Sequence, residues 1–264
     1  MHFKNKVVWI TGASSGIGKE LAIQLAQQEA ILILTSSNTV SLEDVKLELK
    51  STPVHILPYN LLQLDAISAL VDKAVSLEGR IDYVIQSAGI SQRSLANDTT
   101  MDVYKKLMDI NYFAPVAITQ AILPYFKKNN SGSMTVISSI AGLIGFPLRS
   151  GYAASKHAIK GYLETLQCEL FKTNITLSLV YPGRINTNIS KNALVGDGKQ
   201  YGATDENNEV GMDVRLCAEK IIKGLRLNQK SIIIVKAERI LFWLWWFVPS
   251  LYYKIAHYKG LQNK

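Results

Sequence analysis

Short apolar runs alternate with longer amphipathic stretches through most of the chain. The short runs carry few charged side chains, which is typical of strands covered on both faces. They predict strands at residues 6–11, 31–35, 54–59, 83–86, 133–138, 176–181 and 231–235. The longer stretches repeat their apolar residues at the period of a helix. They predict helices at residues 17–29, 42–51, 65–78, 101–127, 152–173 and 213–227.

This alternation predicts an α/β fold with one doubly wound, seven-stranded parallel sheet of the Rossmann type and helices on both faces. A chain of 264 residues suits one such domain. We place that domain at residues 1–239 and a hydrophobic, aromatic tail at residues 240–264. Residues 184–211 follow neither period and are rich in Asn and Gly, so we predict a lid over a functional site.

The net charge of +8 changes this picture little, because no dense cluster of basic residues accompanies it. We therefore expect no nucleic-acid partner. We interpret the positive charge as one that attracts phosphorylated cofactors or anionic lipid. Cys168 and Cys217 form neither a disulfide framework nor a metal-ligand spacing, so we predict a reducing compartment and no metal. Since no signal-peptide pattern is visible, we expect a cytoplasmic protein, at most peripheral at a membrane surface.

The tail is the most apolar part of the chain. Residues 240–248 are apolar without interruption and hold three of the four tryptophans, yet this run is too short to span a bilayer. Aromatic side chains followed by Lys254 and Lys259 suit a membrane interface. Packing over a pocket or in an oligomer interface explains the same residues, and the pattern leaves both interpretations open.

A glycine-rich turn connects the first predicted strand to the first predicted helix. The sequence Thr-Gly-Ala-Ser-Ser-Gly-Ile-Gly ends at Gly18. Gly12 allows a sharp turn, Gly16 lets the backbone approach a pyrophosphate, and Gly18 lets the helix pack closely. Free N–H groups at the helix start then attract phosphates. We predict nucleotide binding by Gly12, Ser14, Ser15, Gly16, Ile17 and Gly18.

Tyr152 and Lys156 are four positions apart and share one face of a predicted helix. A phenol titrates near pH ~10, and a neighbouring ammonium favours its ionised form. The pair is therefore a candidate acid/base device, although an aromatic packed beside a surface lysine has the same spacing.

The glycine turn and this pair together resemble the classical short-chain dehydrogenase/reductase family. Three further motifs stand in the family's order and spacing: Asn111, Ser139 and Pro182-Gly183. Residues 89–95, residues 151–158 and the aromatic tail are most similar to the branch called dehydrogenase/reductase member seven.

The resemblance implies an oxidoreductase in which Ser139 binds the substrate carbonyl and Tyr152 exchanges its proton. It implies that Lys156 lowers the pKa of Tyr152 and binds the nicotinamide ribose, and that Asn111 holds a water beside Lys156. Taken singly, Ser139 caps a turn and Asn111 is a polar residue tolerated in a helix. A non-catalytic nucleotide-binding or sensor protein, or a membrane-surface scaffold, remains the alternative.

Three departures from the family pattern lie around the cofactor. Ser87 replaces the asparagine that precedes Ala88 and Gly89, and Asn60, before Leu61, replaces an aspartate. The second strand is followed by Ser36, Ser37 and Asn38, which supply neither a carboxylate nor an arginine. We therefore favour NADP(H) over NAD(H). By resemblance, the remaining cofactor contacts are Pro182, Gly183, Ile185 and Thr187.

The predicted pocket wall at residues 141–148 is almost wholly apolar, which favours a hydrophobic, lipid-like carbonyl compound or alcohol. Arg149 and Arg184 follow in sequence; we interpret both as solvated surface residues, with contact to an acidic substrate group as the alternative. Apolar stripes on the helices at 101–127 and 152–173 predict, by resemblance, a homodimer or homotetramer.

Overall fold

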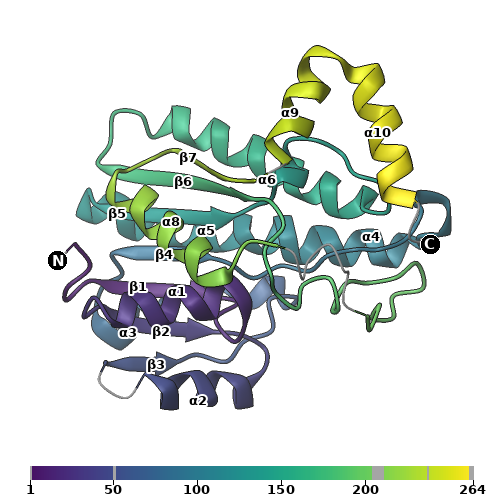
Figure 1. Ribbon diagram of the computed structural model, residues 1–264. Helices are drawn as coiled ribbons and strands as arrows, with labels where there is room; N and C mark the ends of the chain where they lie inside the picture. Colours follow the sequence, from purple (N-terminus) through teal and green to yellow (C-terminus); the bar gives the residue numbers. More distant parts are fainter. Residues whose placement is uncertain (1, 50–51, 204–210, 237, 262–264) are drawn as a thin grey trace.

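The computed structural model describes residues 2–49, 52–203, 211–236 and 238–261. Its centre is one sheet of seven parallel strands in the order β3-β2-β1-β4-β5-β6-β7 (Figure 1). The strands are β1 Val7–Thr11, β2 Ile31–Thr35, β3 Val54–Ile56, β4 Tyr83–Gln86, β5 Gly132–Ile137, β6 Ile175–Pro182 and β7 Ser231–Ile234. The predicted fold class and all seven strands are confirmed.

The strand order reverses between β1 and β4. Strands β2 and β3 extend the sheet on one side of β1, and β4 to β7 extend it on the other. The loops that leave β1 and β4 therefore diverge at their carboxyl ends and leave a crevice, which is where ligands bind in sheets of this kind. Strand β3 ends earlier than predicted, at Ile56, although the N–H groups of Leu57 and Tyr59 still donate to the carbonyls of Leu34 and Ser36.

Helices cover both faces of the sheet. They are α1 Gly16–Ala26, α2 Thr39–Glu48, α3 Ile67–Glu78, α4 Met101–Met108, α5 Ala114–Asn129, α6 Ser150–Glu169, α8 Val214–Arg226, α9 Glu238–Phe247 and α10 Pro249–Leu261. One core cluster joins α1, α2 and α8 to the sheet, and a second joins α3, α5 and α6 to its other face (Figure 1). The end of the predicted helix at 42–51 lies outside the described residues.

The long helix predicted at 101–127 is interrupted. A π turn, Asp109–Phe113, separates α4 from α5 and contains Asn111. Four residues after Asn111 stands Pro115, which has no N–H to donate to the Asn111 carbonyl. The hydrogen-bond ladder therefore widens by one residue at this point, and such turns often mark functional sites.

The tail forms a hairpin of two helices, α9 and α10, which packs over residues 140–146 (Figure 1, yellow). Tyr252 is 1% exposed, and its hydroxyl donates to the carbonyl of Gly145. The second interpretation of the tail, packing over the pocket, thus describes its inner face. Among the helices that the structure describes, none is both long enough and apolar enough to cross a bilayer.

Candidate active site

A cavity of about 610 Å³ lies at the carboxyl ends of the central strands. Its walls come from the loops after β1, β2, β4, β5 and β6, from α6 and from the tail hairpin. The predicted site residues that line it are Gly12, Ser14, Ser15, Gly16, Ile17, Ser36, Ser37, Asn60, Leu61, Ser87, Ala88, Gly89, Ser139, Tyr152, Lys156, Pro182, Gly183, Ile185 and Thr187. Gly18, Asn38 and Asn111 are not among the lining residues.

The glycine turn is tightly constrained. Gly12 has a φ of +68°, and a Cβ added there would lie 2.6 Å from the Cα of Ala88. A Cβ on Gly18 would lie 2.3 Å from the carbonyl oxygen of Gly12. No side chain caps the start of α1, and no acidic residue lies in its first turn. This end of α1 therefore offers backbone N–H groups to an anion, and a dinucleotide phosphate fits it.

The residues after β2 and β3 differ in what they offer to a nucleotide. The hydroxyl oxygens of Ser14 and Ser36 are 2.8 Å apart in the cavity wall. The side chain of Asn38 instead caps α2, because its Oδ1 accepts from the backbone N–H of Ser41 at 3.0 Å. This cap uses only the acceptor oxygen of Asn38, so a contact between its Nδ2 donor and a 2′-phosphate stays a prediction. Asn60 lines the cavity, and its Oδ1 accepts from the Leu62 N–H.

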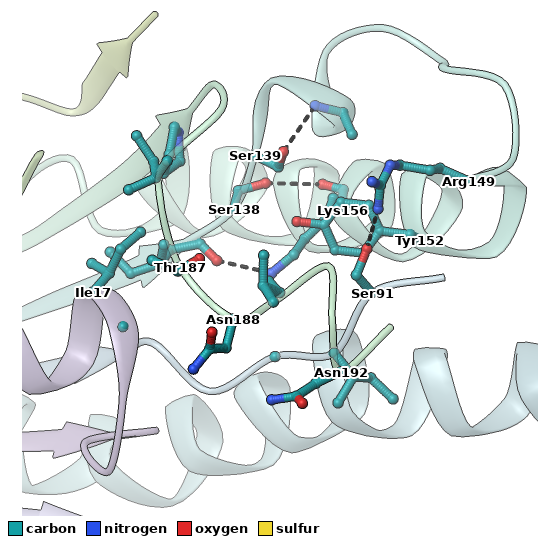
Figure 2. Close-up of a pocket in the computed structure, with 18 of the residues that line it drawn as sticks. Ile17, Ser91, Ser138, Ser139, Arg149, Tyr152, Lys156, Thr187, Asn188 and Asn192 are labelled. Atoms are coloured by element: carbon teal, nitrogen blue, oxygen red, sulfur yellow. Dashed lines mark hydrogen bonds between the residues drawn. The ribbon is translucent and has the colours of Figure 1, made fainter. Parts of the chain in front are cut away.

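Tyr152, Lys156 and Ser139 come together on one wall of the cavity. Figure 2 shows Tyr152 and Lys156 on the same helix, α6, with Ser139 at the end of β5 facing them. The Oγ of Ser139 accepts from the backbone N–H of Ala141 at 3.1 Å, so it does cap a turn. A serine hydroxyl that accepts one bond still has its proton to donate, and the cap holds it in place.

Burial raises the pKa of Tyr152, while the side chain of Ser139 and the positive charge of Arg149 act to lower it. Burial outweighs both of these contributions, so the expectation that Lys156 lowers this pKa stays a prediction. The Nζ of Lys156 lies 5.8 Å from the centre of the Tyr152 ring and donates to the carbonyl of Ile137 at 2.9 Å. Burial lowers the pKa of Lys156 itself to about 8.

Asn111 anchors the loop that follows β4. Its Oδ1 accepts from the N–H of Ile90, and its Nδ2 donates to the Ile90 carbonyl and to the Ser155 hydroxyl, each at 3.0 Å. A Cβ on Gly89 would lie 3.1 Å from this Oδ1 and 3.4 Å from the Nζ of Lys156. The Asn111 side chain therefore holds the loop and α6 together, and a glycine at position 89 keeps the space between them open.

Gln92 was not predicted as a site residue. Its side chain is 0% exposed, and its Oε1 accepts from the N–H groups of Gly151 and Tyr152 at the start of α6. Its Nε2 donates to the hydroxyls of Ser94, Thr99 and Ser150 at 2.9 to 3.3 Å. A lone glutamine in a polar loop carries no sequence signal for this role. Apart from Ser94, the residues that its side chain bonds lie seven or more positions away in the sequence.

Arg149 is half-buried and lines the cavity, which corrects its interpretation as a solvated surface residue. Its guanidinium donates to the Ser91 hydroxyl at 2.5 Å and to the Gln92 carbonyl at 3.2 Å (Figure 2 shows the contact with Ser91). Arg184 is exposed, as expected, although it also borders the cavity.

The cavity is strongly basic. Among the residues that the structure describes, six basic ones line it: Arg93, Lys106, Arg149, Lys156, Arg184 and Lys259. Among the described lining residues, Glu238 is the only acid. Its carboxylate accepts from the N–H of Arg184 at 2.9 Å and of Lys236 at 3.0 Å, which ties the start of α9 to the turn after β6. This balance of charge favours an anionic ligand such as a dinucleotide.

Part of the predicted lid closes one side of the cavity. The backbone of Leu194 pairs with the segment around Gln92: Arg93 N–H donates to the Leu194 carbonyl at 2.8 Å, and Leu194 N–H donates to the Ser91 carbonyl at 2.9 Å. Residues 204–210 of that lid lie outside the described residues.

Comparisons with known proteins find relatives over most of this chain. The family model of the short-chain dehydrogenases matches residues 6–196. "Dehydrogenase/reductase SDR family protein 7-like" of Drosophila melanogaster is 38% identical over 257 residues, covering 95% of this chain and 79% of the relative. "Dehydrogenase/reductase SDR family member 7B" of Mus musculus is 35% identical over 256 residues, covering 95% and 76%.

Solved structures share the fold at lower identity. A short-chain dehydrogenase/reductase from Burkholderia phymatum, in complex with NAD, superposes with a TM-score of 0.83 at 19% identity, over 95% of this chain and 96% of its own. An alcohol dehydrogenase from Thermococcus sibiricus, complexed with 5-hydroxy-NADP, has a TM-score of 0.75 at 22% identity, over 88% and 96%.

Proposed function

This chain belongs to the short-chain dehydrogenase/reductase family and is an oxidoreductase; we propose that it interconverts a carbonyl group and an alcohol on a hydrophobic, lipid-like substrate, with NADP(H) as cofactor. Its relatives of the member seven branch confirm the resemblance that the motifs indicate. The observation that carries the proposal is the convergence of Tyr152, Ser139 and Lys156 on one wall of a cavity that begins at a dinucleotide-type glycine turn.

In the direction of reduction, the Ser139 hydroxyl donates a hydrogen bond to the substrate carbonyl oxygen, and the Tyr152 hydroxyl gives that oxygen its proton. In the reverse direction, Tyr152 accepts the proton of an alcohol. The bound nicotinamide supplies the hydride chemistry. The raised pKa of Tyr152 keeps its proton in place at neutral pH, so the phenol is ready to act as an acid.

Lys156 and Arg149 supply positive charge beside this proton. Because the pKa of Lys156 is lowered to about 8, most of this side chain is still an ammonium at pH 7. An ammonium and a guanidinium both favour the phenolate that is left after Tyr152 gives up its proton. We assign Lys156 a second role, as a ligand of the nicotinamide ribose.

Preference for NADP(H) is supported by the surface that follows β2. Ser36 and Ser37 line the cavity there, and no carboxylate stands at this point to repel a 2′-phosphate. The predominance of basic lining residues acts in the same direction. The Nδ2 of Asn38 is a further donor for a 2′-phosphate in this proposal, because the cap of α2 uses only the side-chain oxygen.

The substrate side of the cavity is supported as apolar by its lining. Ala141, Phe146, Pro147 and Leu148 line it from the loop after β5, and Leu241 and Ile255 line it from the tail hairpin. Such a lining favours a ligand with a long apolar part and a carbonyl or alcohol at its reacting end.

We also propose a homodimer or homotetramer that pairs through α5 and α6, because Phe113, just before α5, and Phe171, just after α6, leave apolar surface exposed. Light scattering on the purified protein measures its mass, and a monomer at micromolar concentration contradicts the proposed oligomer.

We also propose a reducing, cytoplasmic location. Both cysteines are free, which supports this proposal.

The test of the chemistry is Tyr152→Phe. This change removes the proton donor and leaves the ring, so turnover of ketones and aldehydes with NADPH falls by ~10³-fold or more, while NADPH affinity by nicotinamide fluorescence stays within about twofold. Tyr162→Phe, on the same helix, is the control and retains turnover. Near wild-type turnover in Tyr152→Phe would overturn the proposal.

A further inference from the structure

From Ile240 to Phe247, the helix α9 is apolar on all sides. Its inner residues, among them Phe242 and Trp245, pack against the cluster around Ile140 and Ile144. Its outer residues Trp243, Trp246 and Phe247 are 50%, 64% and 67% exposed. An ordinary surface helix has a polar outer face that water solvates. A helix that is apolar all round instead suits an apolar environment on its outer side as well as on its inner side.

The exposed apolar surface continues around the turn between α9 and α10. Val248 and Leu251, at this turn, are 47% and 43% exposed. Together with Trp246 and Phe247 they form what we call the hairpin tip. Turns at a protein surface are usually polar, because their backbone and side chains meet water. Figure 1 shows the hairpin projecting beyond the sheet and its covering helices, with this turn at its far end.

Basic residues flank the hairpin tip on both sides. No charged residue occurs between Arg239 on α9 and Lys254 on α10, and both of these side chains are exposed. At a rise of 1.5 Å per residue, Arg239 lies about 12 Å and Lys254 about 8 Å from the turn along their helices. Cations at that height reach anionic headgroups when an apolar tip lies ~5–10 Å deep at the acyl boundary.

We propose that the hairpin tip inserts into the interfacial layer of an anionic phospholipid membrane. Charge complementarity selects this occupant, because the tip is uncharged, its flanks are basic and the chain carries a net charge of +8. Tryptophan and tyrosine side chains at the hairpin surface suit the headgroup level. The two helices have 10 and 13 residues, so the contact is shallow and one-sided.

The inner side of the same hairpin faces the cavity, which gives the contact a use. Leu241 on α9 and Ile255, Ala256 and Gly260 on α10 line the cavity. The hairpin thus lies between the membrane and the site, and an apolar substrate dissolved in the bilayer reaches the cavity along its helices. This route rests on the proposed function, whereas the insertion of the tip does not.

The insertion is tested by sedimentation with vesicles of phosphatidylcholine alone and of phosphatidylcholine with phosphatidylserine. The tip variant Trp246→Ser/Phe247→Ser/Leu251→Ser changes only exposed residues, and its melting temperature verifies the fold. We expect the wild-type protein to bind the anionic vesicles. We expect the affinity of the variant for them to be lower by about tenfold or more. The control Val40→Ser/Leu47→Ser/Leu227→Ser removes equally exposed apolar groups elsewhere and binds like wild type.

Quenching of tryptophan fluorescence by brominated acyl chains gives a second measure, since it requires entry of the tip into the acyl region. The proposal is overturned if the wild-type protein does not bind anionic vesicles, or if the control variant loses as much binding as the tip variant. If instead the tip variant only converts a dimer to a monomer in light scattering, the tip binds a second copy and the proposal is wrong.

The route is tested by turnover. The tip variant is expected to raise the apparent KM for a long-chain ketone supplied in vesicles by about tenfold, while kcat/KM for a short, water-soluble ketone is unchanged. An equal loss on both ketones contradicts the route. Because vesicle binding needs no turnover, its result stands by itself if the proposed chemistry fails.

Discussion

The side-chain oxygen of Gln92 accepts a hydrogen bond from the backbone N–H of Tyr152 at 3.3 Å, and one from Gly151 at 2.7 Å. Both N–H groups belong to the first turn of α6, where the helix itself has no acceptor for them. The backbone that carries the proposed proton donor is thus held by a side chain from another part of the chain, the loop after β4. Gln92 acts as a positioning residue for Tyr152.

Gln92→Leu should lower kcat by ~10- to 100-fold with little change in the KM for NADPH. The change leaves two buried N–H groups and several hydroxyls without their partner, and a shift of the Tyr152 backbone misplaces the proton. Steady-state kinetics separates kcat from KM. Gln86→Leu is the control, because Gln86 is also buried but bonds Thr119 instead. Equal losses of kcat in both variants would show that Gln92 stabilises the fold and does not position Tyr152.

Lys156→Met should stabilise the cofactor-free protein at pH 7 while it abolishes turnover. The pKa of Lys156 is about 8 in the folded protein and 10.5 as the ordinary value, so burial penalises its charged form. That penalty is complete below pH 8 and disappears as the pH rises to 10.5, because only the unfolded chain binds the proton in this window. The penalty is on the order of 3 kcal/mol. In Lys156→Met, loss of the hydrogen bond to Ile137 offsets about 1 kcal/mol of the stability that is gained by removing this penalty.

Thermal unfolding from pH 7 to pH 10 measures this effect. The melting temperature of Lys156→Met should exceed that of the wild type most at pH 7, and the difference should shrink toward pH 10. Lys160→Met, one turn further along α6 and paired with the exposed Glu164, should show no such trend. A lower melting temperature for Lys156→Met at pH 7 contradicts the prediction.

Gly18→Ala should destabilise the protein by about 1–3 kcal/mol and weaken NADPH binding. The added Cβ would lie 2.3 Å from the carbonyl oxygen of Gly12 and 3.3 Å from the Cα of Ala13, and this backbone has little room to move. Gly161→Ala, in α6, meets nothing within 4 Å and should stabilise by up to ~1 kcal/mol, as alanine does in a helix. Thermal unfolding and cofactor titration compare the two, and a neutral Gly18→Ala would show that the turn relaxes easily.

Ser36→Asp should shift the cofactor preference from NADPH toward NADH by ~10- to 100-fold. A carboxylate at the end of β2 repels a 2′-phosphate and accepts a hydrogen bond from a ribose 2′-hydroxyl. The ratio of kcat/KM for the two cofactors is the measurement. Ser41→Asp, in the first turn of α2, serves as a control for added charge. A wild-type enzyme that already prefers NADH would contradict the proposed cofactor.

The sequence by itself determined the alternation of strands and helices, the glycine turn and the Tyr152/Lys156 spacing. These features are local: periodicity follows from backbone geometry within one element, and a turn of eight residues builds its own phosphate-binding shape. The strand order then follows from few topological choices, since parallel strands need helical crossovers. This explains why the fold and the residues of the proposed site were predictable.

The tertiary structure alone decided what each polar side chain of the site touches. Gln92 reaches α6 across almost sixty residues, and the amine of Lys156 turns to the Ile137 carbonyl. Arg149 lies in the cavity wall and donates to the Ser91 hydroxyl. Such partners depend on which loops meet at the sheet edge, which no local pattern encodes. The two faces of the tail hairpin, one over the cavity and one exposed, emerged in the same way.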